Sequence, residues 1–316
     1  MKKNLPKILV TGATGFVGSN LTRKLIALSC PVTIFVRKSS NFWRIKDMIS
    51  KLDICEVDIS DAPKVKKNLN KIRPDIIFHL ANAGLYRGES ASPEILVKTN
   101  LIGTINLMEA AKNIPIKIFV NTGSSAEYGP KDKPMNEEDL CMPTTFYGLT
   151  KLSSTLATNI YASRQKIPIV TLRLFSPFGP FDDKSRLISH TILSALKNKP
   201  LYLGSPTSVR DYIFIGDVIS AYLKFLISPK RLVPIINIGS GSQLTVQTVV
   251  AKILKFTNSK SKIYWHRESA RPQESPVWQA DIQKAKKLLK WQPKTKIDEG
   301  FIKTIEWFRK NLRYYT

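Results

Sequence analysis

The sequence has few cysteines, few histidines and no long apolar run, and each shortage excludes a class of protein. Its three cysteines, Cys30, Cys55 and Cys141, are widely spaced in 316 residues and form no Cys-x-x-Cys pair. They predict neither a disulfide framework nor a metal site, and they suit a reducing cytoplasm. No apolar run reaches the roughly 18 residues that a membrane-spanning helix needs. The short apolar start continues directly into "TGATG", which predicts a first strand rather than a signal peptide.

Acidic residues are also scarce, because 24 aspartates and glutamates stand against 49 lysines and arginines, a net charge of +25. An excess of this size can indicate a nucleic-acid or membrane surface. The basic residues are spread along the chain, however, and the densest cluster, "KAKKLLK" at 284–290, has the pattern of a solvated helix face. We therefore predict no nucleic-acid and no membrane partner, and we expect the charge to favour small polyanionic ligands such as nucleotides.

Short apolar runs alternate with helix-like segments over about the first 175 residues, and the helix-like segments include 16–28, 93–112 and 144–163. Near-continuous apolar runs are typical of strands buried on both faces. The pattern predicts an α/β fold with a doubly wound (Rossmann) parallel sheet. After Ser176 the pattern loosens, so we expect a dinucleotide-binding domain at 1–176 and a smaller substrate-binding lobe at 177–316, interleaved with the first. The strand-like runs are "KILVTG", "PVTIFVR", "LDICEVD", "DIIFHLA", "KIFVNTG" and "IVTLRLF".

A glycine-rich turn, "TGATGFVG", follows the first predicted strand and begins the first predicted helix. Gly12, Gly15 and Gly18 have the spacing G-x-x-G-x-x-G. Glycines permit the tight turn and let the backbone approach a pyrophosphate, and the helix N-terminus offers N–H groups and positive potential. In this strand–turn–helix context the motif predicts a dinucleotide site.

The ends of the second and third predicted strands bear on which dinucleotide binds. NAD enzymes usually place an acidic residue after the second strand to accept from the ribose 2′-hydroxyl. This chain has Arg37 there, followed by Lys38 and Ser39. A guanidinium can clamp a 2′-phosphate, which favours NADP over NAD, although Arg37 could instead stack on adenine. Asp58, after the third strand, is placed to accept from the adenine amine or to cap the next helix.

Tyr147 and Lys151 in "FYGLTK" lie four residues apart, and so share one face of a helix. A free tyrosine has a pKa near 10, and an adjacent ammonium lowers that pKa by stabilising the phenolate. Such a tyrosine can donate or accept a proton near neutral pH. Tyr147 is the only one of the ten tyrosines that has a lysine at +4.

Taken together, the motifs resemble the extended short-chain dehydrogenase/reductase family of nucleotide-sugar epimerases, dehydratases and reductases. The resemblance covers nearly the whole chain, in family order, through "TGATGFVG", "HLAN", "NLIGTINLMEA", "TGSSAEYG", "FYGLTK", "LRLFSPFGP", "RDYIFIGDV", "INIGSGS" and "ADIQKAKKLLKWQP". It implies that Ser124 is the catalytic hydroxyl beside Tyr147, that Lys151 also grips the nicotinamide ribose, and that Asn100 anchors the chain near the site. The implied cofactor site comprises Gly12, Thr14, Gly15, Phe16, Val17, Gly18, Arg37, Asp58, Ile59, Leu80, Ala81, Asn100, Thr122, Tyr147 and Lys151.

The resemblance also separates the possible reactions. Dehydratases of this family carry a glutamate base two residues before the motif tyrosine, and the corresponding slot before Tyr128 holds Ala126. Glu127 is shifted by one residue and, in an extended strand, would point to the opposite face. We therefore expect NADPH-dependent reduction of the 4-keto group of a CDP- or GDP-linked 4-keto-6-deoxyhexose in surface-polysaccharide synthesis. The alternatives are an NAD-dependent nucleotide-sugar 4-epimerase and a non-catalytic NADP-binding sensor.

On the substrate side, the resemblance assigns Arg210 in "RDYIF" and Arg271 in "RPQES" to the diphosphate, with Ser125 and Ser176 also near the substrate. Ser176 and Phe178 replace the asparagine and tyrosine of the usual family pattern. Sugar recognition is therefore the part of the resemblance that can least be carried over to this chain. His79 ends a buried strand without a carboxylate or cysteine partner nearby, and we expect it to be packed rather than to bind a ligand. Relatives often pair through two long helices, here 93–112 and 144–163, which predicts a homodimer.

Overall fold

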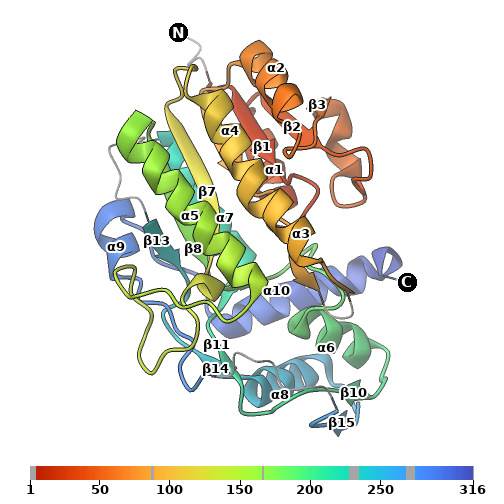
Figure 1. Cartoon of the computed structure of the whole chain (residues 1–316). Coiled ribbons are helices and arrows are strands. Elements are labelled where there is room, and N and C mark those ends of the chain that lie inside the picture. Colours follow the sequence, from red (N-terminus) through yellow and green to blue (C-terminus); the bar gives the residue numbers. More distant parts are fainter. Residues whose placement is uncertain (1–4, 87–88, 166, 228–234, 268–274, 316) are drawn as a thin grey trace.

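The centre of the molecule is a seven-stranded, entirely parallel sheet in the order β13-β8-β7-β4-β1-β2-β3 (Figure 1). The computed structural model describes residues 5–86, 89–165, 167–227, 235–267 and 275–315. This sheet confirms the predicted doubly wound α/β fold. Its strands are β1 (Ile8–Thr11), β2 (Val32–Val36), β3 (Asp53–Glu56), β4 (Ile76–His79), β7 (Ile118–Ser124), β8 (Ile169–Leu174) and β13 (Ile235–Ile238).

Helices cover both faces of the sheet. In Figure 1, α4 (Gly103–Ala111) and α5 (Phe146–Gln165) lie side by side across the near face, and α2 (Ala62–Ile72) packs against α4. On the other face, α1 (Phe16–Ala27) packs against α7 (Ile215–Ile227). Successive strand residues enter opposite cores: Val10 and Phe78 pack on the α1 and α7 side, and Leu9 and Ile77 on the α2 and α4 side. Burial on both faces therefore explains the near-continuous apolar runs.

The helical segment predicted at 93–112 is present but is not uniform. It consists of α3 (Pro93–Leu96), a π-helical stretch (Val97–Ile102) and α4, which follow one another without a break. Pro93 occupies the first turn, where it costs no hydrogen bond, and the Ser92 side chain accepts the N–H of Ile95. The π-helical stretch contains Asn100, and such stretches often occur at functional sites.

The chain after Ser176 forms a lobe below the sheet, but it also returns to the sheet (Figure 1). Strand β13 forms the edge next to β8, and α7 covers the rear face. The sequence pattern did not reveal β13 as a strand; the boundary between 1–176 and 177–316 stays a prediction. Helix α9 (Gln283–Leu289) also returns to the sheet and packs against β13. The lobe contains α6 (Leu187–Leu196), α8 (Val246–Thr257), α10 (Ile297–Lys310) and the short pairs β9 (Ser176–Phe178) with β12 (Tyr212–Phe214), β10 (Leu201–Tyr202) with β15 (Ile263–Tyr264), and β11 (Val209–Arg210) with β14 (Leu244–Thr245).

Aromatic side chains hold the lobe together. Phe178 of β9 packs on Phe301 of α10 at 5.0 Å between ring centroids, and Phe308 lies 4.7 Å from Tyr315. Trp291 is buried and donates its ring N–H to Ser220 on α7, which ties the C-terminal segment to the sheet. None of the helices in the described ranges has both the length and the apolar character required to traverse a bilayer.

Candidate active site

The turn between β1 and α1 brings the chain backbone close to the end of β4. Gly12 has φ +74°, and a Cβ there would lie 2.5 Å from the backbone of both Leu80 and Ala81. A Cβ on Gly18 would lie 2.1 Å from the Gly12 carbonyl oxygen. Gly15 is the N-cap residue of α1, so the N-terminus of this helix has no side-chain cap. The turn therefore needs glycine for steric reasons, and it leaves backbone N–H groups directed at an incoming anion.

The predicted cofactor residues follow five strands that are contiguous in the sheet. Thr122 lies in β7, Leu80 and Ala81 follow β4, the glycine turn follows β1, Arg37 follows β2, and Asp58 and Ile59 follow β3. Since the strands are parallel, all these residues lie at the carboxyl edge, where open α/β sheets bind ligands. The structure thus brings these predicted residues together along five of the seven strands. Thr14, Phe16 and Val17 belong to the same glycine turn and the first turn of α1.

Arg37 and Asp58 are exposed neighbours at the ends of β2 and β3. The Asp58 carboxylate accepts hydrogen bonds from the Ser60 backbone at 2.9 Å and from its hydroxyl at 2.8 Å. Burial raises the pKa of Asp58, but these hydrogen bonds and the charges of Arg37 and Lys98 leave it below its ordinary value. The next helix, α2, is capped by Asp61 and not by Asp58, so the alternative reading of Asp58 as a helix cap is wrong.

Lys151 is buried under the end of β7. Its ammonium donates a hydrogen bond to the Thr122 carbonyl oxygen, and the Thr122 hydroxyl pairs with Tyr222 at 2.7 Å. Burial lowers the pKa of Lys151 from 10.5 to about 8, while the negative charge of Glu127 raises it. Tyr147 lies one helical turn earlier on α5, so the two residues share one face of that helix, as the sequence predicted.

Ser124 ends β7, and the next three residues form a 3₁₀ turn, Ser125–Glu127. The inference that Glu127 points away because strand residues alternate is therefore wrong, since the strand has already ended. Glu127 is nevertheless unavailable as a base, because it is fully buried and paired with Arg173 at 2.7 Å. The start of α5 packs on this turn: a Cβ on Gly148 would lie 2.4 Å from the Ala126 carbonyl oxygen. This contact sets the helix turn of Tyr147 against the strand end of Ser124.

Asn100 and His79 lie behind the site as buried hydrogen-bonding residues. The Asn100 amide exchanges two hydrogen bonds with the Ala83 backbone, at 2.8 and 3.0 Å, and donates to Thr150 on α5 at 3.0 Å. His79 bonds Thr11 through Nδ1 at 2.7 Å and Thr104 through Nε2 at 2.9 Å. Burial and the Lys151 charge lower the pKa of His79 to about 3, so it is a packed neutral residue, as predicted.

On the substrate side, the structure adds a residue that the sequence did not single out. Trp278 is buried and donates its ring N–H to the Ser125 hydroxyl at 3.1 Å. Arg210 stacks on the Trp278 ring at 4.8 Å. Trp278 therefore joins two predicted substrate residues that are 85 positions apart in the chain. Arg271 lies outside the described residues.

Asp211 is a second residue that the sequence did not single out. Its buried carboxylate accepts four hydrogen bonds, from the Ser240 backbone and hydroxyl and from the backbones of Gly241 and Ala280. Burial raises its pKa to about 6, although these hydrogen bonds favour the charged form. The Asp211 carbonyl also accepts from the Ser176 backbone at 2.9 Å. Asp211 thereby links Ser176 to the segments that contain Ser240 and Ala280.

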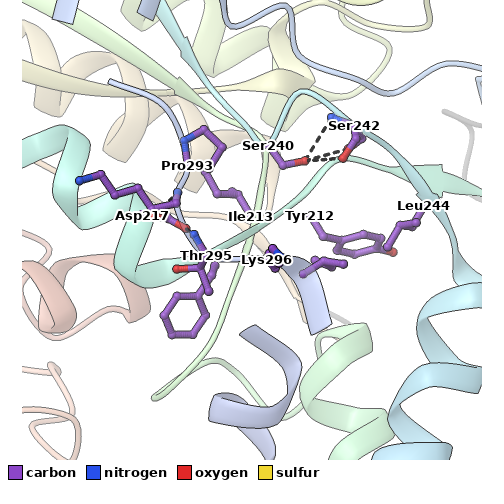
Figure 2. Close-up of a pocket in the computed structure, with 12 residues that line it drawn as sticks. Tyr212, Ile213, Asp217, Ser240, Ser242, Leu244, Pro293, Thr295 and Lys296 are labelled. Atoms are coloured by element: carbon purple, nitrogen blue, oxygen red, sulfur yellow. Dashed lines mark hydrogen bonds between the residues drawn. The ribbon is translucent and has the colours of Figure 1, made fainter. Parts of the chain in front are cut away.

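A hollow of about 420 Å³ lies elsewhere in the lobe, between β12, the start of α7 and the segment before α10. Figure 2 shows Asp217 turned toward the backbone of Thr295, and Ser240 bonded to Ser242. Asp217 accepts the N–H groups of Lys294 and Thr295 at 3.0 and 3.1 Å. None of the described residues that were predicted for the site lines this hollow. Its acidic side chain, Asp217, is already hydrogen-bonded to backbone groups. Within the described ranges, no cluster of three or more His, Cys, Asp or Glu side chains could hold a metal ion.

Comparison with known proteins places this geometry in context. Residues 8–239 match the NAD dependent epimerase/dehydratase family. The chain is 26% identical to the UDP-glucuronate 4-epimerase of Thermodesulfobacterium geofontis over 96% of both chains. It is 30% identical to the UDP-N-acetyl-alpha-D-glucosaminuronate decarboxylase of Bacillus cytotoxicus over 98% of both. The fold superposes on the UDP-glucuronic acid 4-epimerase of Bacillus cereus in complex with UDP-glucuronic acid and NAD, with a TM-score of 0.87 and 28% identity over 96% of this chain and 99% of that one.

Proposed function

Because the chain belongs to the NAD-dependent epimerase/dehydratase family, we propose that it is an NAD-dependent 4-epimerase of a UDP-linked sugar. One observation carries the proposal: α5 sets Tyr147 and Lys151 against the strand end of Ser124, while Ala126 fills the dehydratase base slot. Similarity to epimerases of UDP-sugars supports the alternative stated from the sequence better than it supports the 4-keto reductase. The reductase therefore becomes the second candidate.

The glycine turn fits the pyrophosphate of a dinucleotide. At Gly12 no side chain separates the backbone of the turn from the end of β4, and the uncapped start of α1 supplies N–H groups. Gly12, Gly15 and Gly18 would hold the pyrophosphate, Asp58 the adenine, and Lys151 the nicotinamide ribose. We propose residues 1–176 as the cofactor-binding part and 177–316 as the part that completes the nucleotide-sugar site. The sugar nucleotide would contact Arg210 of the second part and Ser125 and Ser176 of the first.

The proposed chemistry uses three side chains of this chain. The 4-hydroxyl of the sugar lies between Ser124 and Tyr147, and the Tyr147 phenolate takes its proton as the Lys151 ammonium stabilises the phenolate. Bound NAD would supply the hydride acceptor for C4 and the source from which that hydride returns. Ser124 donates a hydrogen bond to the ketone oxygen in the interval. The 4-keto sugar then rotates in the site and exposes the opposite face of C4. The hydride returns to that face and Tyr147 returns the proton to the oxygen, so C4 has the opposite configuration.

Incubation of the purified protein with UDP-glucuronate and with UDP-glucose tests the proposal. We expect one of them to be converted into its 4-epimer, measured by NMR of the products, with NAD that co-purifies and is not consumed. A uronate oxidised at C4 is a β-keto acid and can lose carbon dioxide. Release of carbon dioxide with formation of a UDP-pentose would therefore replace the epimerase by a decarboxylase. No conversion of any UDP-sugar would contradict both.

One observation favours the second candidate, the NADPH-dependent reductase. Arg37 follows β2 and is exposed, so its guanidinium is available to a 2′-phosphate. Solved relatives hold NAD, which favours the epimerase. Oxidation of NADPH in the presence of a CDP- or GDP-4-keto-6-deoxyhexose, with no epimer formed from 4-hydroxy sugars, would establish the reductase instead.

We also propose a homodimer formed through α5 and the segment 93–111. Large apolar side chains are exposed on these neighbouring helices, and Leu149, Leu156 and Ile160 form a stripe at helical spacing on α5. Ile95 and Ile102 add to the apolar surface on the adjacent segment. A second copy of the same surface would bury both sets. Leu156→Glu should shift the mass in sedimentation experiments from dimer to monomer; a native monomer would refute the proposal.

A further inference from the structure

A buried carboxylate lies directly behind the end of β7, and the proposed reaction does not use it. Glu127 is fully buried. One carboxylate oxygen accepts the Ser124 backbone N–H at 2.8 Å, and the other accepts Arg173 Nε at 2.7 Å. Arg173 belongs to β8, the strand next to β7. The carboxylate therefore links the turn after Ser124 to a neighbouring strand of the sheet.

The surroundings of this carboxylate leave the turn little room to move. A Cβ on Gly123 would lie 2.6 Å from a Glu127 carboxylate oxygen, so the strand passes directly over the acid. On the other side, Gly148 of α5 contacts the Ala126 carbonyl. The Ser124 hydroxyl also accepts the Ala126 N–H at 3.2 Å. The turn is thus held between the carboxylate and the helix that carries Tyr147.

An ion pair is an expensive way to hold a turn in a protein core. Burying two charges costs more free energy than an apolar contact of similar size unless their hydrogen bonds are complete. Here they are not complete, because Arg173 Nη1 is buried without a hydrogen-bond partner in the described part of the chain. The rest of the guanidinium stacks on the Tyr128 ring at 4.5 Å. Because the pair is costly, we expect the negative charge of Glu127 to act on a nearby group.

Besides Arg173, the buried cation near this turn is Lys151. Its ammonium donates to the carbonyl oxygen of Thr122, the residue before Gly123, which the Glu127 carboxylate contacts. The titratable groups around Lys151 are His79 from β4, Tyr222 from α7 behind Thr122, Tyr147 on its own helix, and Glu127 from the turn. His79 is neutral because its pKa is lowered to about 3, and burial raises the pKa of Tyr222. Glu127 is the group whose charge raises the pKa of Lys151 against the effect of burial.

We propose that Glu127 is a positioning residue of this site, whose carboxylate fixes the backbone that presents Ser124 and supplies the negative charge that keeps the Lys151 ammonium protonated in the core. The inference rests on the proposed function for the roles of Ser124 and Lys151. It goes beyond that function because it assigns a task to a side chain that contacts neither sugar nor dinucleotide.

Two substitutions separate the charge from the reach of this side chain. Glu127→Gln keeps the length and an oxygen for the Ser124 N–H but removes the charge. In protein labelled with ¹³C at lysine Cε, Lys151 should titrate about one pH unit lower in Glu127→Gln than in the native protein. Lys151→Arg identifies the signal, because it removes only the Lys151 resonance.

Glu127→Asp keeps the charge but is one methylene too short to bond Ser124 and Arg173 together. We expect its kcat to fall about tenfold or more with KM within about twofold of the native value, because a displaced catalytic group slows the reaction without weakening binding. The Lys151 titration should stay close to native in this variant. The Glu127→Asp variant therefore still tests the proposal if Glu127→Gln does not fold.

Asp182 provides a matched control. Its buried carboxylate also accepts a backbone N–H, from Asp183 at 2.8 Å, and an arginine, Arg186, at 2.9 Å. Asp182→Asn removes an ion pair between a buried carboxylate and a partly exposed arginine, and it should leave the Lys151 titration unmoved. An unmoved Lys151 titration in Glu127→Gln overturns the proposal, and so does native turnover in Glu127→Asp. The titration needs no substrate. If the protein converts no sugar, the proposed function is wrong, but the Lys151 titration still tests the role of Glu127.

Discussion

Replacing Lys151 by methionine should abolish activity and yet stabilise the protein at neutral pH. The side chain is almost fully buried, and burial lowers the pKa of its ammonium from 10.5 to about 8. The unfolded chain keeps the proton up to its ordinary pKa, whereas the folded chain keeps it only to about 8. Each pH unit of this difference corresponds to about 1.4 kcal/mol, so the buried charge costs about 3 kcal/mol of unfolding free energy below pH 8.

Methionine has a similar length and carries no charge, so it removes this cost. It also leaves the Thr122 carbonyl oxygen without its donor, which costs about 1–2 kcal/mol. The variant should therefore be more stable than the native protein by about 1–2 kcal/mol at pH 7. Between pH 8 and 10.5 the unfolded native chain binds more protons than the folded one, so native stability rises with pH. The advantage of the variant should shrink over this range and reverse at its upper end.

Urea unfolding of both proteins, without added nucleotide, at several pH values from 7 to 10.5 measures this difference. Lys303→Met serves as the control, because Lys303 is half exposed and its loss should change stability by about 0.5 kcal/mol or less, with no trend between pH 7 and 10. A variant less stable than the native protein at pH 7, or a difference that stays constant with pH, would refute the reasoning.

Two other substitutions test the site. Gly18→Ala should abolish NAD retention or lower the melting temperature by several degrees, because its Cβ would lie 2.1 Å from a carbonyl oxygen; Gly204→Ala, with nothing within 4 Å, is the control for calorimetry and cofactor analysis. Trp278→Phe should raise KM for the nucleotide sugar about tenfold and leave kcat within about threefold, because Ser125 loses its hydrogen bond while Arg210 keeps a ring to stack on. Steady-state kinetics with kcat lowered and KM native would contradict this role.

Much of the sheet could be predicted from the sequence, because each strand of the parallel sheet from β1 to β8 overlaps its own apolar run. The strand β13 was missed because "IINI" lies in a part of the chain with weak periodicity, although it is as long as β1 and β4. Its place in the sheet depends on pairing with Thr171–Leu174, more than 60 residues earlier, which no local pattern encodes.

The pair Tyr147 and Lys151 could be predicted because helical periodicity alone puts both on one face. Glu127 could not, because its direction depends on where β7 ends, and a strand and a 3₁₀ turn cannot be told apart over three residues. Trp278 lies 153 residues from the hydroxyl to which it donates. Contacts of this kind depend on the tertiary fold, so the substrate side of the site was the least predictable part.

The late return of β13 has a consequence for synthesis of the chain on the ribosome. When only the segment up to β8 has emerged, that strand has one bare edge, with N–H and C=O groups open to pairing with another nascent chain. The edge is covered only after roughly 60 further residues have been translated, which takes several seconds at typical elongation rates. During that interval we expect a chaperone to shield the growing chain, and expression at low temperature or with slowed initiation to raise the soluble yield.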